Sequence, residues 1–124
     1  MRVSLMLCGL CLGLCGGCIS HHETVVRDAP RAKVEFENDQ IRVVRWVVSP
    51  GDKTAKHSHP ASLIVLLTDY DGRVTTADGK STEAHYKAGA AMWREALTHV
   101  VENIGQHPME GIIVEPKKAA SPRP

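Results

Sequence analysis

The sequence predicts an all-β domain, built as an antiparallel sandwich or a small barrel. Short apolar or alternating runs follow one another, and turn-forming residues separate them. No long stretch shows the 3.6-residue period of an amphipathic helix. Asp-Gly, a strong hairpin signal, occurs at Asp71-Gly72 and at Asp78-Gly79. Several short strands at such spacing are typical of antiparallel sandwiches and barrels.

The strands are expected where the apolar or alternating runs lie, and the turns where Gly, Pro, Asn or Asp interrupt them. The expected strands are Val34–Glu37, Ile41–Val48, Ser62–Thr68, Arg73–Thr76, Thr82–Lys87, Ala90–Arg94, His99–Ile104 and Glu110–Glu115. The expected turns are Asn38-Asp39, Ser49-Pro50-Gly51, Asp71-Gly72, Asp78-Gly79, Ala88-Gly89 and Gly105.

The run Leu63-Ile-Val-Leu-Leu67 leaves neither face of its strand polar. Such a strand is expected to be covered on both sides. One face fills the interior, and the other needs a terminal segment or a second subunit. A homodimer is predicted, because an isologous dimer is the commonest way to supply that cover.

Length and charge limit the function classes. At 124 residues the chain forms one domain at most, and 15 Lys+Arg nearly balance 14 Asp+Glu. No basic stripe or mixture of basic and aromatic residues argues for nucleic acid. Aromatic residues make up 4% of the chain, so the core is expected to consist mainly of aliphatic side chains.

The first eighteen residues contain all four cysteines and an apolar segment from Val3 to Leu14, next to Arg2. The segment is too short to span a bilayer and is typical of a signal peptide, here residues 1–17. Gly16-Gly17-Cys18 resembles the lipobox of bacterial lipoproteins, although Cys15 stands where that class prefers Leu. The resemblance implies lipidation of Cys18 and an exported protein anchored to the membrane in the cell envelope. An ordinary cleaved signal, a misread start and a metal-binding cysteine pattern are the alternatives.

Three further segments follow the signal peptide. Residues 18–31 are polar and suit a tether, residues 32–116 form the predicted domain, and residues 117–124 are proline-rich and basic and are predicted to be disordered.

Two histidines, His57 and His59, stand two residues apart before the apolar run. On an extended backbone, which Pro60 favours for the residue before it, both side chains point to the same face. A third histidine, His99, opens a later expected strand. If the sheet brings it to the pair, three imidazoles meet inside the barrel. His85 and His107 are expected to be exposed.

These residues carry a resemblance to the cupins. Gly51, His57-x-His59 and Gly72 look like the first cupin motif, and His99-Val-Val-Glu-Asn103 looks like the end of the second. The stretches Leu67-Thr-Asp69 and Ala88-Gly-x-x-x-Trp93-Arg-Glu-Ala96 are similar to small single-domain cupins that include one associated with β-alanine degradation. The resemblance implies a cupin-type antiparallel β-barrel, also called a double-stranded jelly roll.

The resemblance also implies a divalent transition metal, Fe, Mn, Ni, Cu or Zn, held by His57, His59 and His99. Where the first motif has a glutamate ligand, this chain has Leu63 and Ile64. Glu95 and Glu102 are the nearby carboxylates considered as replacements, and strand parity turns Glu102 outward. Neutral imidazoles suit these metals better than magnesium or calcium. A metal-free pocket with hydrogen-bonded histidines is the alternative.

Tyr70 and Arg94 are candidate pocket residues beside Glu95, and Trp93 is expected in the core. A three-histidine centre favours a small chelating organic acid or related metabolite, processed by oxygenation or isomerisation. A non-catalytic ligand-binding module of the envelope and a purely structural, dimeric barrel are the alternatives. The sequence does not decide whether the protein is an enzyme.

Overall fold

The computed structural model of the protein describes residues 32–118. The predicted signal peptide, the tether and lipidation at Cys18 lie outside the described residues, as do residues 119–124 of the predicted tail. Lys117, where disorder was expected to begin, is held in place, because its backbone N–H donates to the carbonyl of Gln40 at 2.7 Å. Within residues 32–118 no helix is long and apolar enough to cross a membrane.

Nine strands make up the described domain, and they are joined by turns and short loops. They are β1 (Lys33–Glu37), β2 (Ile41–Val48), β3 (His57–His59), β4 (Ser62–Leu66), β5 (Tyr70–Thr76), β6 (Ser81–Tyr86), β7 (Ala91–Arg94), β8 (Leu97–Asn103) and β9 (Met109–Pro116).

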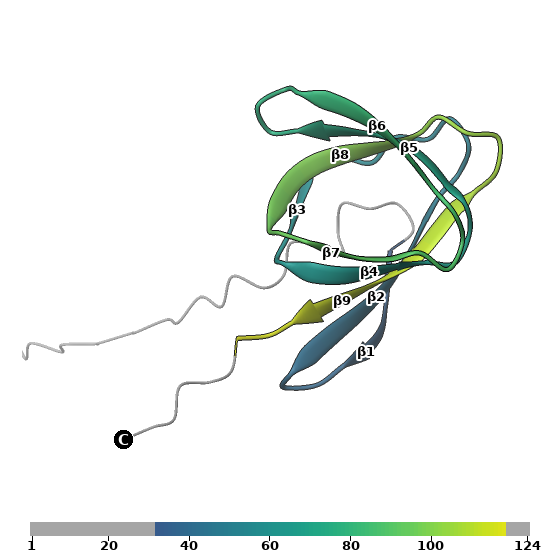
Figure 1. The fold of residues 1–124 in the computed structure, drawn as a ribbon. Coiled ribbons are helices and arrows are strands. Elements are labelled where there is room, and N and C mark those ends of the chain that lie inside the picture. The colour runs from purple at the N-terminus through teal and green to yellow at the C-terminus, as the bar shows by residue number, and fades with distance from the viewer. Residues whose placement is uncertain (1–31, 119–124) are drawn as a thin grey trace, which may run out of the picture.

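The strands form two antiparallel sheets that face each other (Figure 1). One sheet has five strands in the order β1-β2-β9-β4-β7, and the other has four in the order β3-β8-β5-β6. Apart from the pairs β1-β2 and β5-β6, neighbouring strands are distant in sequence, as in a jelly roll, where the chain crosses repeatedly between the two sheets. The prediction of an all-β antiparallel barrel is confirmed.

The core between the sheets is small and mainly aliphatic, as the composition predicts. Its buried members are Val48, Ile64, Leu66, Tyr70, Met109 and Ile113. Asn103 is buried beside them, and its side-chain amide donates to the carbonyls of Val48 and His107, at 2.9 and 2.8 Å. These bonds tie the end of β8 to β2 and to the loop before β9, which fixes the sheet that carries His99.

The Asp71-Gly72 turn prediction is wrong, because both residues lie inside β5. Gly72 is needed there for packing: a Cβ at this position would overlap the ring of Tyr70. The other Asp-Gly pair does form a turn, between β5 and β6, and Gly79 has a φ of 84° that favours glycine.

Strand β4 is covered on one side only within the described chain. Ser62, Ile64 and Leu66 are buried, whereas Leu63 keeps 38% of its surface exposed. Trp93 on neighbouring β7 is 54% exposed, so its expected place in the core is wrong. Its strand neighbours Met92 and Arg94 face inward, and strand alternation therefore turns Trp93 outward.

One continuous apolar row crosses the outside of the five-stranded sheet. Paired positions run from β1 to β7 through every strand, and we call this set the outer apolar row: Phe36, Val43, Val114, Leu63 and Trp93. Phe36 and Trp93, at its two ends, are each more than half exposed.

Candidate metal centre

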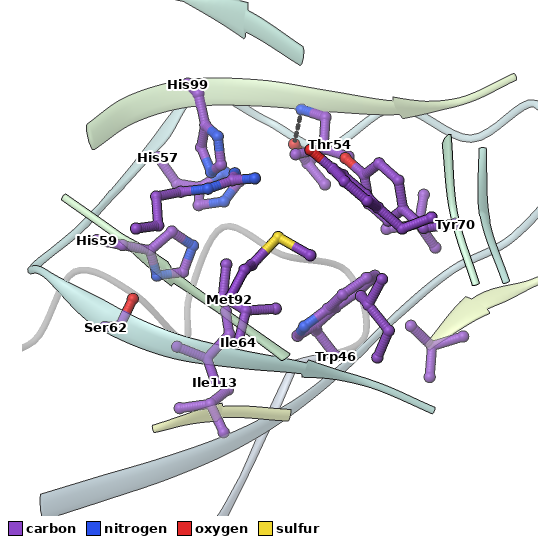
Figure 2. A pocket seen from close by; sticks show the side chains of 17 residues that line it. Trp46, Thr54, His57, His59, Ser62, Ile64, Tyr70, Met92, His99 and Ile113 are labelled. Atoms are coloured by element: carbon purple, nitrogen blue, oxygen red, sulfur yellow. Dashed lines mark hydrogen bonds between the residues drawn. The ribbon is translucent and has the colours of Figure 1, made fainter. Parts of the chain in front are cut away.

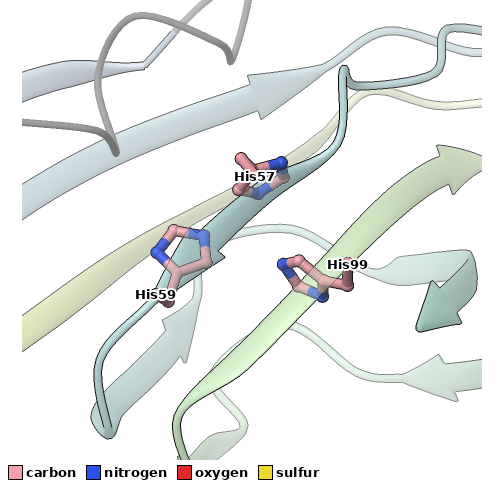
Figure 3. Close-up of side chains that lie close together, drawn as sticks. All are labelled: His57, His59 and His99. Atoms are coloured by element: carbon pink, nitrogen blue, oxygen red, sulfur yellow. The ribbon is translucent and has the colours of Figure 1, made fainter. Parts of the chain in front are cut away.

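The three predicted histidines come together on two paired strands. His57 on β3 lies directly opposite His99 on β8, and His59 follows on the same face of β3 (Figure 3). The ring centroids of His57 and His99 are 4.7 Å apart, and those of His59 and His99 are 5.4 Å apart. All three rings point toward one another from the inner face of the four-stranded sheet (Figure 3).

The three side chains have the composition and spacing of a metal site. One nitrogen from each ring lies within 4.8 Å of the other two. Nitrogens bound to one ion at about 2.1 Å each are separated by about 3 to 4 Å. Small side-chain rotations therefore suffice to bring the three nitrogens onto a single ion.

Hydrogen bonds hold the rings of His57 and His59 through Nδ1, so that Nε2 of each ring remains available to bind a metal ion. The Nδ1 of His57 lies 2.8 Å from the carbonyl oxygen of Ala55, and the Nδ1 of His59 lies 3.1 Å from Oε1 of Glu115. Both partners are acceptors, so each Nδ1 carries the proton and donates it. In a neutral ring the lone pair then lies on Nε2, the nitrogen that a metal ion would bind.

His99 is held differently. It is 4% exposed, and neither of its ring nitrogens has a hydrogen-bond partner among the described residues. Burial, with the nearby charges of His57, His59 and Arg94, lowers the pKa of His99 to about 3. The ring is therefore neutral at physiological pH. A buried polar ring without a partner is costly, and a bound metal ion would satisfy it.

Glu115 on β9 is the carboxylate beside the histidines, and it was not predicted from the sequence. Its side chain is 6% exposed and bonds to His59 from the opposite sheet. A signal was present in the alternation of β9, where Glu115 shares the inward face with the apolar Ile113 and Met109. The carboxylates that were considered lie elsewhere: Glu102 pairs with Arg73, as parity predicted, and Glu95 is exposed.

The histidines form one wall of a cavity of about 70 Å³ between the sheets (Figure 2). Most of its lining is apolar and includes Trp46, Ile64, Met92 and Ile113. Tyr70 lies at the end away from the histidines (Figure 2).

Of the three candidate pocket residues, Tyr70 and Arg94 line the cavity and Glu95 does not. The carboxylate of Glu95 instead accepts a hydrogen bond from Nε1 of Trp93 outside the barrel. His85 and His107 are exposed, as expected, and His85 lies 2.8 Å from Asp71.

No family model and no curated protein matches the chain. Solved structures do resemble it, however. A cupin domain from Bordetella pertussis Tohama I is 25% identical, with a TM-score of 0.64, over 69% of this chain and 91% of that chain. A double-stranded β-helix domain protein from Klebsiella pneumoniae is 24% identical, with a TM-score of 0.55, over 73% of this chain and 82% of that chain.

An RmlC-like cupin family protein from Methanocaldococcus jannaschii is 19% identical, with a TM-score of 0.55, over 73% of this chain and 84% of that chain. The described domain thus has the cupin-type barrel that the sequence motifs predicted, with three histidines placed to bind a metal. The narrower resemblance to a cupin associated with β-alanine degradation stays a prediction.

Proposed function

We propose that the barrel binds one divalent transition-metal ion through His57, His59 and His99. The observation that carries this proposal is the state of the ring nitrogens. Two rings donate from Nδ1 to fixed acceptors, and the third is buried with both nitrogens unpartnered. The candidate metals are Fe, Mn, Ni, Cu and Zn. A set of three neutral imidazoles favours transition metals over magnesium and calcium, which prefer oxygen ligands.

A small chelating organic acid or related metabolite is the proposed ligand of this centre. Three neutral imidazoles leave an ion its full double charge, and Glu115 offsets only part of it through its bond to His59. An anionic ligand would complete the neutralisation. When bound, the metal would supply Lewis-acid or redox chemistry, as in oxygenases and isomerases. The histidines position the ligand, and the apolar walls exclude water from it.

Metal analysis of protein purified without an affinity tag tests the centre. We expect close to one transition-metal ion per chain in the wild type, and at least a fivefold loss in H57A, H59A and H99A, because two imidazoles hold an ion much less tightly than three. H85A and H107A are the matched controls, since both residues are exposed outside the cavity, and they should keep the metal. Equal metal content in all six proteins would refute the site.

A non-catalytic ligand-binding module of the cell envelope is the second candidate. The mostly apolar cavity suits binding as well as turnover. Oxygen uptake or product formation with a carboxylate or thiol would favour an enzyme. Ligand-induced thermal stabilisation without turnover would favour the binding module, and neither effect would favour a structural barrel.

The location proposed for the protein is the cell envelope, with Cys18 lipidated and residues 18–31 linking the anchor to the barrel. The support is the apolar segment followed by Gly16-Gly17-Cys18. C18S should move the protein from the membrane fraction to the soluble fraction without changing its melting temperature. Mass spectrometry that finds an unmodified Cys18 in the native host would exclude lipidation.

Pairing of two copies through the outer apolar row is the proposed quaternary structure. Its support is the exposure of Phe36, Leu63 and Trp93 on one continuous sheet face. Contiguous exposed apolar surface on a small domain is typical of an interaction site.

A further inference from the structure

Arg94 is the charged residue of the cavity that the metal centre does not use. It ends β7, where it pairs with Ser62 of β4, and both residues line the cavity. The side chain is neither fully buried nor fully exposed. Its positive charge acts on groups at both ends of the cavity. It helps to lower the pKa of His99, and it opposes the increase in the pKa of Tyr70 that burial causes.

The guanidinium of Arg94 has no acidic partner within residues 32–118. The ion pairs of that part of the chain use other bases, and none includes Arg94. Glu115, the one buried carboxylate of the described residues, is taken by His59. Adjacent Glu95 bonds to Trp93 outside the barrel. A cation in a mostly apolar cavity is unfavourable without a counter-charge, so the missing partner is expected from a ligand.

We propose that Arg94 is the anion-binding residue of the cavity and that it holds the carboxylate of a small acid with an apolar body. A planar guanidinium matches a carboxylate in a bidentate pair, which fixes the orientation of the acid as well as its charge. Trp46, Met92, Val101 and Ile113 provide the apolar contacts. The part of the acid that reaches the histidines would carry a donor atom for the metal, and only this last contact rests on the function proposed above.

The size of the cavity limits the acid. About 70 Å³ holds several water-sized groups, each of which needs roughly 10 to 15 Å³. A short-chain acid of roughly five or six non-hydrogen atoms fits this space. Recognition therefore depends on one charged contact and a short apolar chain.

Paired acids and amides test the assignment directly. Acetate, propionate, butyrate and isobutyrate are titrated against their neutral amides, which have nearly the same shape without the charge. The readout is the fluorescence of Trp46 in a W93F background, where Trp46 is the sole tryptophan of the chain. We expect at least one acid to bind about tenfold more tightly than its amide. R94Q should reduce that preference to less than twofold, and R94K should retain part of it.

R45Q is the matched control, because Arg45 lies on the same sheet and its charge pairs with Glu110 outside the cavity. It should leave the acid preference unchanged. R94Q should melt at the wild-type temperature or above it, since it removes a charge without a partner. If no acid is preferred over its amide, or if R94Q and wild type show the same preference, the proposal is overturned. A fall in melting temperature of R94Q without loss of preference would also assign Arg94 a structural role instead.

Two forms of the protein separate this inference from the metal proposal. In chelator-treated, dialysed protein the acid preference should persist, since the guanidinium acts without metal. R94Q should contain as much metal as the wild type. Loss of metal from the histidine variants with an intact acid preference supports both proposals. A wild type that is purified without metal, takes up none when metal is supplied and still prefers acids refutes the metal centre alone. A metal-loaded wild type without any preference refutes the role of Arg94 alone.

Discussion

The three histidines of the candidate centre are held in different ways, and this difference decides what the site can do. Ala55 and Glu115 orient the first two rings, whereas His99 depends on burial alone. A residue that is buried without partners destabilises the metal-free fold more than the metal-bound fold. Metal binding and folding stability should therefore be coupled most strongly at His99.

The pH dependence of the metal-free protein should report on His99. Its pKa falls from 6.5 to about 3 on folding, so the unfolded chain binds this proton more readily than the native state. The stability that depends on neutral His99 is complete above about pH 6.5 and is lost as pH falls toward 3. We expect the free energy of unfolding, measured in urea between pH 6 and 4, to depend less on pH in H99Q than in the wild type. The difference between the two slopes should be up to about 1.4 kcal/mol per pH unit. Identical slopes would contradict the buried, neutral ring.

Glu115 should set the metal affinity of His59 without being a ligand. Its carboxylate accepts the Nδ1 proton of His59 and makes the opposite nitrogen a better donor. E115Q should weaken metal binding by about tenfold to hundredfold in chelator competition, because second-sphere carboxylates act at that scale. Glu110 on the same strand provides the control: it pairs with Arg45 on the outer face, and E110Q should bind metal as the wild type does.

Strand alternation explains which parts of the site could be predicted from the sequence. The pair His57 and His59 follows from spacing alone, because residues two apart share a face. Trp93 was misplaced because its run contains two hydrophobic residues of opposite parity, and only the pairing of β7 with β4 decides which faces inward. Glu115 was missed because its partner lies 56 positions away, on the other sheet. Local patterns do not contain contacts of that kind.

Two adjacent positions on β4 allow a test of the glutamate that the first cupin motif would contain. Ile64 is 8% exposed and lines the cavity, whereas Leu63 points outward. I64E should place a carboxylate inside, lower the melting temperature of the metal-free protein, and tighten metal binding because it neutralises one charge of the ion. L63E carries the same charge outside and should leave metal binding unchanged. If both variants bind metal equally, β4 does not face the centre as described.

At the scale of the whole molecule, the two faces of the five-stranded sheet have different tasks. The inner face closes the cavity, while Phe36, Leu63 and Trp93 of the outer apolar row are exposed within residues 32–118. The all-apolar run at Leu63 to Leu67 predicts a cover on both sides of its strand, and within residues 32–118 only the inner side is covered. The sequence could not identify the cover, because a terminal segment and a second subunit bury the same side chains. Only the assembled protein distinguishes them.

Light scattering during size-exclusion chromatography tests the homodimer. We expect the mass of two chains at concentrations well above micromolar, because the outer apolar row of each copy would bury the other's Phe36, Leu63 and Trp93. L63E should shift the protein to one chain, since a buried, unpaired carboxylate at the centre of the row opposes association, and it should still retain its metal. T82E places the same charge on exposed β6 of the other sheet and should remain dimeric. A wild type that elutes with the mass of one chain would contradict the homodimer. A terminal segment of the same chain would then be the remaining candidate for the cover of this face.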